Sequence, residues 1–318
     1  MEDGGDDFDR EVIVDGNNNV SRRGFVGGVA TAAGVLGLTP ARKLFAEAAR
    51  MTPREREVAR AALDEYDSYA KISFNENPYG PPESVMKAMN GAMKYANRYG
   101  YPDGGIVEAI AKLHGVKHEN VLLSAGSGEM LDVIGTTFTQ GNKAVIGVTP
   151  SYMQVYEHVT TVRARAIELP LTADYRQPIP ELIKAAHEHY RDLGFIYLCN
   201  PNNPTGRIVT KSEVRDLLDG IPQDVPVLID EAYVDFCGET AVPLIAGHPN
   251  LLVVQTMSKS RSLAGLRVGY ALGDAGLIEA LRRVKDSFNS YPLGRVAQAG
   301  ATASVRDDGY FRESCARV

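Results

Sequence analysis

The chain has 318 residues, a length that allows one large domain or two of medium size, each with an ample core. Its apolar fraction of 44% and charged fraction of 23% are typical of a globular protein and exclude wholesale disorder. The net charge of −6, without a long basic run, gives no reason to expect nucleic acid as a partner. Three cysteines without a CxxC pair indicate neither a disulfide framework nor a zinc site. We expect His114, His118, His187 and His189 to be exposed helix residues, so no metal site is predicted.

The N-terminal segment has the pattern of an export signal. Residues 1–20 are acidic and rich in Asn and Gly, and they are predicted to be disordered. Arg22 and Arg23 then precede an apolar run, residues 27–38, that is too short for a stable membrane span, which takes roughly 20 residues. A charged pair, a short apolar run and the small residues around Ala48 fit a cleavable signal, and the paired arginines resemble the twin-arginine type. Residues 1–48 therefore predict an exported or periplasmic protein, or a cytoplasmic one if the segment is an uncleaved tail.

The next segments alternate between helical and irregular patterns. Residues 53–69 are polar with a helical pattern. Residues 72–82 contain three prolines and a glycine, which force turns. Helices are predicted over 83–95 and 104–114, the second with Asp103 at its cap.

From this point apolar runs and helical patterns alternate. The runs cover residues 121–123, 144–148, 164–169, 195–199, 225–229, 251–254 and 268–272. Thr210 and Glu213 form a capping box that opens one of the intervening helices. Continuous apolar strands are typical of a largely parallel sheet covered by helices on both faces. The prediction is a single large α/β domain with a seven-stranded, mostly parallel sheet.

Polar groups follow several of these strands, at the edge where such sheets bind ligands. The turn at Gly126 opens a helix after the first strand and could hold an anion, although a glycine turn alone is weak evidence. Tyr152 follows the second strand and could lie flat on an aromatic ring. Asn203 follows the fourth strand. Asp230 ends the fifth as a partly buried carboxylate that needs a cation, either an arginine or a protonated pyridine nitrogen.

Lys259 follows the sixth strand among small hydroxyl residues. A lysine that loses solvation there has a lowered pKa and becomes a nucleophilic amine, whereas a solvated lysine is an ordinary surface residue. The hydroxyls of Thr256 and Ser258 and the guanidinium of Arg267 suit the oxygens of a phosphate. A lysine beside a phosphate cradle suggests pyridoxal phosphate.

Taken together, the sequence blocks resemble the fold-type I pyridoxal-phosphate aminotransferases, and most of all the histidinol-phosphate aminotransferase group. The blocks are Asn75-Glu76-Asn77-Pro78-Tyr79-Gly80, Asn202-Asn203-Pro204-Thr205-Gly206, Asp230-Glu231-Ala232-Tyr233-Val234-Asp235-Phe236, and Ser258-Lys259 followed by Leu263-Ala264-Gly265-Leu266-Arg267-Val268-Gly269. The likeness extends from about residue 70 to the end. It implies an N-terminal arm with part of a small domain over 49–98 and a cofactor-binding large domain over 99–318. The C-terminal part of the small domain, with the family's carboxylate-binding arginine, is expected to be missing.

The resemblance also implies a role for each matching residue. Lys259 would form a Schiff base with pyridoxal 5′-phosphate and transfer a proton, Asp230 would hold the ring nitrogen, and Tyr233 and Asn203 would bind the phenolic oxygen. Tyr152 would stack on the ring, and Tyr79 and Asn203 would lie on the substrate side. The phosphate would be held by Gly126, Ser127, Gly128, Thr256, Ser258 and Arg267, and by Tyr101 of a neighbouring subunit.

The implied activity is ping-pong transfer of an amino group between an amino acid and a 2-oxo acid, by a homodimer with a shared site. Two alternatives remain open: a decarboxylase of an amino-acid phosphate on the same fold, and a truncated, non-catalytic homologue that still binds the cofactor.

Overall fold

The computed structural model describes residues 52, 54, 68–100 and 102–318. The chain divides into two compact units, residues 1–70 and 71–318, and the second contains the sheet. The predicted export signal over 1–48, most of the predicted 53–69 helix and Tyr101 lie outside the described residues.

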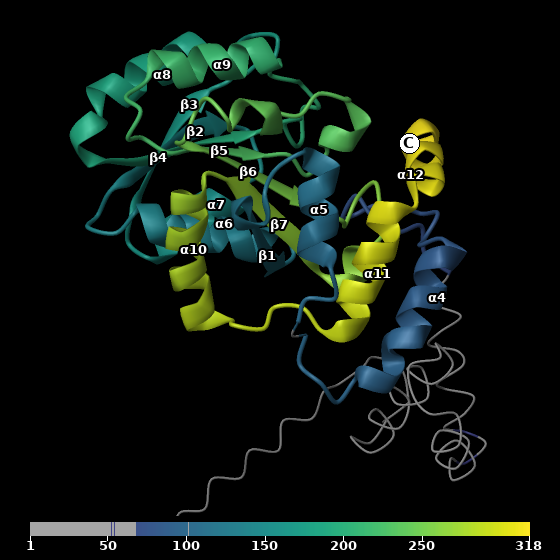
Figure 1. Cartoon of the computed structure of the whole chain (residues 1–318). Coiled ribbons are helices and arrows are strands. Elements are labelled where there is room, and N and C mark those ends of the chain that lie inside the picture. Colours follow the sequence, from purple (N-terminus) through teal and green to yellow (C-terminus); the bar gives the residue numbers. More distant parts are fainter. Residues whose placement is uncertain (1–51, 53, 55–67, 101) are drawn as a thin grey trace, which may run out of the picture. The chain divides into compact units, whose positions relative to one another are not determined.

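The second unit is built on a mixed sheet that has seven strands in its described part (Figure 1). The strands are β1 Val121–Ala125, β2 Ala144–Thr149, β3 Arg165–Pro170, β4 Leu193–Cys199, β5 Val227–Asp230, β6 Leu251–Thr256 and β7 Val268–Gly273. Their order is β1-β7-β6-β5-β4-β2-β3, and β7 runs antiparallel to both of its neighbours. The carboxyl ends of the other strands and the start of β7 therefore meet at one edge.

Helices cover both faces of the sheet. Figure 1 shows α8 and α9 on one side and α6, α7 and α10 on the other. The helices are α4 Glu83–Ala92, α5 Ile106–His114, α6 Ser127–Phe138, α7 Gln154–Thr161, α8 Ile179–Glu188, α9 Lys211–Gly220, α10 Ala275–Phe288, α11 Arg295–Arg306 and α12 Asp308–Arg317. Short 3₁₀ helices are η1 Met93–Tyr95, η2 His118–Asn120, η3 Tyr190–Asp192, η4 Val234–Phe236, η5 Val242–Leu244 and η6 Ala264–Leu266.

Each face of the sheet has its own apolar core. In β4, Ile196 and Leu198 pack with α5, α8 and α9, whereas Phe195 and Tyr197 pack with α6, α7 and α10. Successive side chains of a strand point to opposite faces, so a strand covered on both sides must be apolar throughout. This requirement explains the continuous apolar runs in the sequence.

The predicted elements agree with the structure apart from details at their ends. All of the strands predicted between residues 121 and 272 are present. The helix predicted over 83–95 is α4 followed by η1. The helix predicted from residue 104 begins at Ile106, and its N-cap is Gly105 rather than the expected Asp103. The Asp103 carboxylate lies in the preceding turn and accepts from the amides of Gly105 (3.0 Å) and Val107 (3.3 Å).

The expectation that His114 is exposed was wrong. Its ring lies at the end of α5 against Tyr270 of β7, and Nε2 is 3.1 Å from the Tyr270 hydroxyl. Burial, with the charge of Arg261 acting in the same direction, lowers the pKa of His114 to about 4. His114 is therefore a neutral packing residue at physiological pH.

Within the part of the chain that the structure describes, we find no helix with the length and apolar character needed to cross a bilayer.

Candidate functional site

The sheet register brings the predicted site residues to one edge. Asp230 ends β5 between Cys199 of β4 and Val254 of β6. Thr256, at the end of β6, lies opposite Gly269 of β7, and Ala125, at the end of β1, lies opposite Val268. The turns that follow β1 and β6 and the start of β7 therefore share one corner of the sheet.

Lys259 is half-buried in the turn after β6. Its Nζ donates hydrogen bonds to the carbonyl oxygens of Phe74 (2.7 Å) and Asn75 (3.2 Å) and lies 5.5 Å from the centre of the Tyr233 ring. Burial lowers the pKa of this amine, as does the charge of Arg267, while Glu76 and Asp230 act in the opposite direction. A lysine with a lowered pKa has a larger fraction of the free, nucleophilic amine at neutral pH.

Asp230 is a carboxylate inside the protein, with 2% of its surface exposed. Its Oδ1 accepts a hydrogen bond from the amide of Ala232 at 3.1 Å. Burial raises its pKa to about 6, against the opposing effects of that amide, the Tyr197 hydroxyl and the charge of Lys259. A cation placed directly on this carboxylate would offset the desolvation.

Tyrosine side chains surround this pair. The Tyr233 hydroxyl accepts a hydrogen bond from Asn75 Nδ2 at 2.9 Å, and burial raises the pKa of the phenol. Tyr152 has 38% of its surface exposed, and burial and the charge of Asp230 raise its pKa. Its main-chain oxygen accepts from the buried Tyr197 hydroxyl at 3.3 Å. Tyr152 is thus an aromatic side chain open to solvent near the Asp230 carboxylate.

The corner between β1, β6 and β7 is shaped to hold an anion. Gly126 has φ +84° and precedes α6, and a Cβ there would lie 2.3 Å from Nη2 of Arg267. The glycine therefore lets the guanidinium approach the turn, beside the N-terminus of α6, whose first amides have no partner within the helix. On the β6 side, the Thr256 hydroxyl donates to Ser258 Oγ at 2.9 Å. We call these residues, Gly126, Ser127, Gly128, Thr256, Ser258 and Arg267, the anion corner.

A cavity of about 560 Å³ opens beside Lys259. Its lining residues are Asn75, Glu76, Asn77, Pro78, Pro201, Asn202, Asn203, Pro204, Gly206, Ile208, Tyr233, Phe236, Cys237, Lys259 and Val318. Predicted site residues Asn203, Tyr233 and Lys259 are among them, and the anion corner lies at the neighbouring strand ends. Tyr79 lies apart from this lining, with its ring 5.1 Å from the Arg317 guanidinium.

The asparagines around the cavity differ in their contacts. Asn202 has 2% of its surface exposed and is used locally, because its amide donates to the Pro150 oxygen (3.1 Å) and accepts from Ser151 (2.8 Å). Both asparagines line the cavity, but only Asn203 is partly exposed. The contacts of Asn75 and Asn77 with the site were not predicted, although both belong to the block that carried the resemblance.

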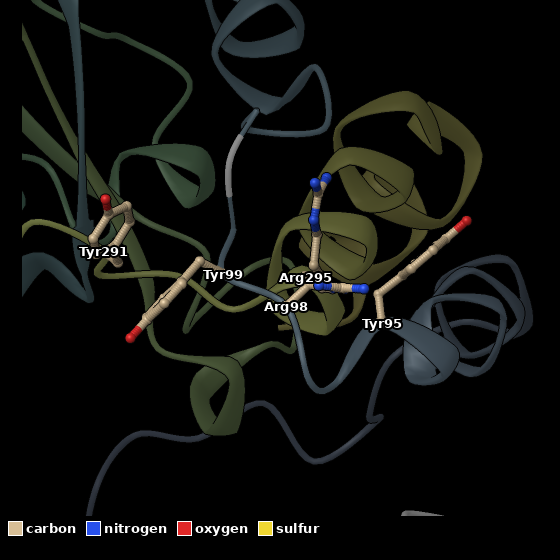
Figure 2. Close-up of a pocket in the computed structure, with 5 residues that line it drawn as sticks. All are labelled: Tyr95, Arg98, Tyr99, Tyr291 and Arg295. Atoms are coloured by element: carbon tan, nitrogen blue, oxygen red, sulfur yellow. The ribbon is translucent and has the colours of Figure 1, made fainter.

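A second and larger cavity, of about 810 Å³, is lined by Tyr95, Arg98, Tyr99, Tyr291 and Arg295 (Figure 2). The Tyr99 and Tyr291 rings lie 4.7 Å apart, and both side chains are more than half exposed. This surface combines aromatic rings with guanidinium groups and has none of the strand-end residues described above.

Comparison with known proteins shows the family to which this chain is similar. The family described as aminotransferase class I and II matches residues 68–317. Histidinol-phosphate aminotransferase 2 of Thiobacillus denitrificans is 45% identical over 253 residues, covering 78% of this chain and 68% of that protein. The histidinol-phosphate aminotransferase of a Marinomonas species is 41% identical over 269 residues, covering 80% and 73%.

Solved structures agree. The putative histidinol-phosphate aminotransferase of Erwinia carotovora atroseptica superposes with a TM-score of 0.73 at 25% identity, covering 77% of this chain and 71% of that one. The Sinorhizobium meliloti histidinol-phosphate aminotransferase, solved in complex with pyridoxal-5′-phosphate, gives 0.71 at 25% identity, with 76% and 66% covered. With this fold, this identity and a family match over most of its length, the chain belongs to the class I and II aminotransferase family.

Proposed function

We propose that this pyridoxal-phosphate-dependent aminotransferase transfers the amino group of histidinol phosphate, or of an amino acid of similar shape, to a 2-oxo acid. The observation that carries the proposal is the pairing of Lys259, an amine with a lowered pKa, with the buried carboxylate of Asp230 at one sheet edge. The names of the relatives support the choice of substrate.

The residues present fit the cofactor. Asp230 would hold the protonated ring nitrogen, which supplies the cation that the buried carboxylate needs. The anion corner would hold the phosphate, because the close approach of Arg267 to Gly126 puts a guanidinium beside a helix N-terminus. Tyr152 would cover one face of the ring, and Tyr233 and Asn203 would hydrogen-bond its phenolic oxygen. When bound, the cofactor supplies an electron sink for the α-carbon of the substrate.

The chain's own residues would supply the rest of the reaction. Lys259 Nζ would hold the cofactor covalently and, as a free amine, would take the proton from the substrate α-carbon. The lowered pKa of Lys259 keeps part of the amine unprotonated, as a base must be. In the cavity, Asn203 would contact the substrate, and Ile208 and Phe236 would give its side chain an apolar wall. Tyr79, which follows Pro78 of that lining, would contact the substrate at the rim of the cavity.

Substitution of Lys259 tests the assignment. Wild-type chain supplied with pyridoxal phosphate and reduced with borohydride should carry the added mass on Lys259, and it should form glutamate from 2-oxoglutarate with histidinol phosphate as donor. Lys259→Ala should lose both signals and keep its circular dichroism spectrum, and Lys143→Ala, at an exposed lysine, should keep both. Wild-type protein that releases carbon dioxide from an O-phosphorylated amino acid, and forms no glutamate with histidinol phosphate and 2-oxoglutarate, would be a decarboxylase instead. Absence of the added mass from Lys259 would refute the proposed site.

We also propose that the active enzyme is a homodimer in which Tyr101 of one subunit reaches the phosphate held by the other. The resemblance supports this arrangement. So does the open aromatic and cationic cavity at Tyr99 and Arg295, because large exposed surfaces of this kind are frequent at interfaces.

For location, we propose export through the twin-arginine signal in residues 1–48. The support is the arginine pair followed by a short apolar run. Replacement of Arg22 and Arg23 by lysine should keep a tagged chain in the cytoplasm of a bacterial host, while the wild-type chain reaches the periplasm. Equal distribution of the two proteins would refute the export proposal.

A further inference from the structure

The side chain of Asn77 connects three segments that are far apart in the sequence. Its Nδ2 donates to the main-chain oxygen of Lys259 at 3.1 Å and to Ser314 Oγ of α12 at 2.8 Å. Its Oδ1 accepts from the amide of Tyr79 at 3.1 Å. The Ser314 hydroxyl in turn donates to the main-chain oxygen of Ser260 at 2.7 Å.

This arrangement uses both the donors and the acceptor of the Asn77 amide. Asn77 is partly buried, whereas its neighbours Glu76 and Pro78 are exposed. Ser260 and Ser314 each have 1% of their surface exposed. A buried donor or acceptor that loses its partner carries the full desolvation penalty, so these bonds hold the turn more firmly than exposed ones would.

The same segment also contacts the other end of Lys259, since Nζ donates to the oxygens of Phe74 and Asn75. Those two contacts must be released whenever the amine reacts. The Asn77 contact uses the main-chain oxygen of Lys259, so it does not compete with the chemistry of the amine. It can hold the lysine main chain throughout the reaction.

We propose that Asn77 and Ser314 are positioning residues, which fix the main chain of Lys259 and Ser260 and thereby the reach of the reactive amine. We call the two side chains the Asn77 clamp. The clamp rests on the proposed function of Lys259. It also gives α12 a role, because Ser314 ties this helix to the turn that carries the lysine.

The test compares Asn77→Ala and Ser314→Ala with Asn120→Ala. Asn120 is a close match, because its Nδ2 donates to the distant Gly273 oxygen at 2.8 Å and its Oδ1 accepts from the Lys117 amide at 3.1 Å, away from the cavity. Ser314→Ala is the milder change and covers the case in which Asn77→Ala fails to fold.

In cofactor-free protein, both clamp variants should raise hydrogen–deuterium exchange of peptides covering residues 257–263 about tenfold, the effect of one lost hydrogen bond. In the enzyme with cofactor, kcat should fall by a similar factor. KM should change little, because the substitutions displace the Lys259 amine and leave the substrate contacts in place. The double variant should lose little more than either single variant, because both side chains act on the same turn. Asn120→Ala should change neither quantity.

An active wild-type enzyme whose clamp variants keep both exchange and kcat unchanged would overturn the clamp alone. Faster exchange with unchanged kcat would also overturn it, because the bonds would then be structural only. A wild-type chain that carries no borohydride label on Lys259 would instead overturn the proposed function, and the exchange measurement would still report whether Asn77 holds the turn.

Discussion

Without a bound cation, the buried charge of Asp230 destabilises the folded chain. The carboxyl is buried and its pKa is raised from 3.8 to about 6, so the folded chain binds this proton more tightly than the unfolded chain does. The stability that this group contributes is present below pH 3.8 and is lost as the pH rises through 6. Without cofactor, the ionised carboxylate therefore destabilises the fold at neutral pH.

Asp230→Asn should relieve this penalty. In cofactor-free protein, its free energy of unfolding should match that of wild type near pH 4 and exceed it at pH 8 by about 3 kcal/mol, the equivalent of roughly two pKa units. Urea unfolding at several pH values measures the difference, and the titration of the neighbouring Glu231 cancels because both proteins share it. Pyridoxal phosphate should raise the Tm of wild type more than that of the variant, and the variant should lose most of its activity. A difference that does not vary with pH would contradict the argument.

Gly126 is the residue whose backbone the anion corner needs. Its φ of +84° and ψ of 161° belong to a region that is almost restricted to glycine, so Gly126→Ala should cost about 1–3 kcal/mol of stability. The new Cβ would also displace Arg267, and the dissociation constant for pyridoxal phosphate should rise about tenfold or more. Gly265→Ala, where a Cβ has no atom within 4 Å, is the matched control and should bind as wild type does. Equal affinities in a fluorescence titration would show that Arg267 does not hold the phosphate.

Among the elements, the strands were predicted most reliably. Each strand buried on both faces must be apolar along its whole length, and this signal is local to the sequence. The start of α5 was predicted two residues early, because Gly104 and Gly105 have positive φ angles and extend the turn before the helix. The misplacement of His114 has a different cause: its partner Tyr270 is 156 residues away, and no local pattern contains that contact.

The difference between local signals and long-range contacts also explains which site residues could be predicted from the sequence. Asp230 and Lys259 directly follow apolar strands, so their place at the sheet edge follows from the strands themselves. Asn77 lies in a turn without regular structure, and its contacts with Lys259 and Ser314 are 182 and 237 residues distant. Only the folded chain brings them together.

The N-terminus of α9 offers a test of a purely local prediction. The capping box is present, since the Glu213 amide donates to Thr210 Oγ1 at 3.2 Å and Glu213 Oε2 accepts from the Thr210 amide at 2.8 Å. Thr210→Ala should lower the free energy of unfolding by about 1 kcal/mol and leave kcat unchanged. Thr160→Ala, at an exposed threonine whose hydroxyl donates to the Glu157 oxygen of its own helix at 2.9 Å, should change stability by less than about 0.5 kcal/mol. If the two variants unfold at the same urea concentration, the cap does not stabilise the helix.

At the scale of the whole molecule, Lys259, Asp230 and the anion corner all come from residues 126–267 of one subunit, and Tyr101 precedes them. If the homodimer proposal is right, a site needs Lys259 and Asp230 from the same subunit and Tyr101 from the other. Substitutions in different subunits should then complement each other only in certain pairs, because two sites are shared between two chains.

This requirement can be measured by co-expressing variants that each have lowered activity. Tyr101→Phe removes one hydrogen bond to a charged group and should lower kcat/KM about tenfold or more. In a mixed dimer of Lys259→Ala and Tyr101→Phe, one site has both substitutions and the other has neither, so about a quarter of all sites in a statistical mixture should regain full activity. Lys259→Ala mixed with Asp230→Ala should regain none, because every site then has one substitution. Recovery in both mixtures, or in neither, would contradict a shared site. Only a tyrosine supplied by the other subunit gives recovery in the first mixture and none in the second.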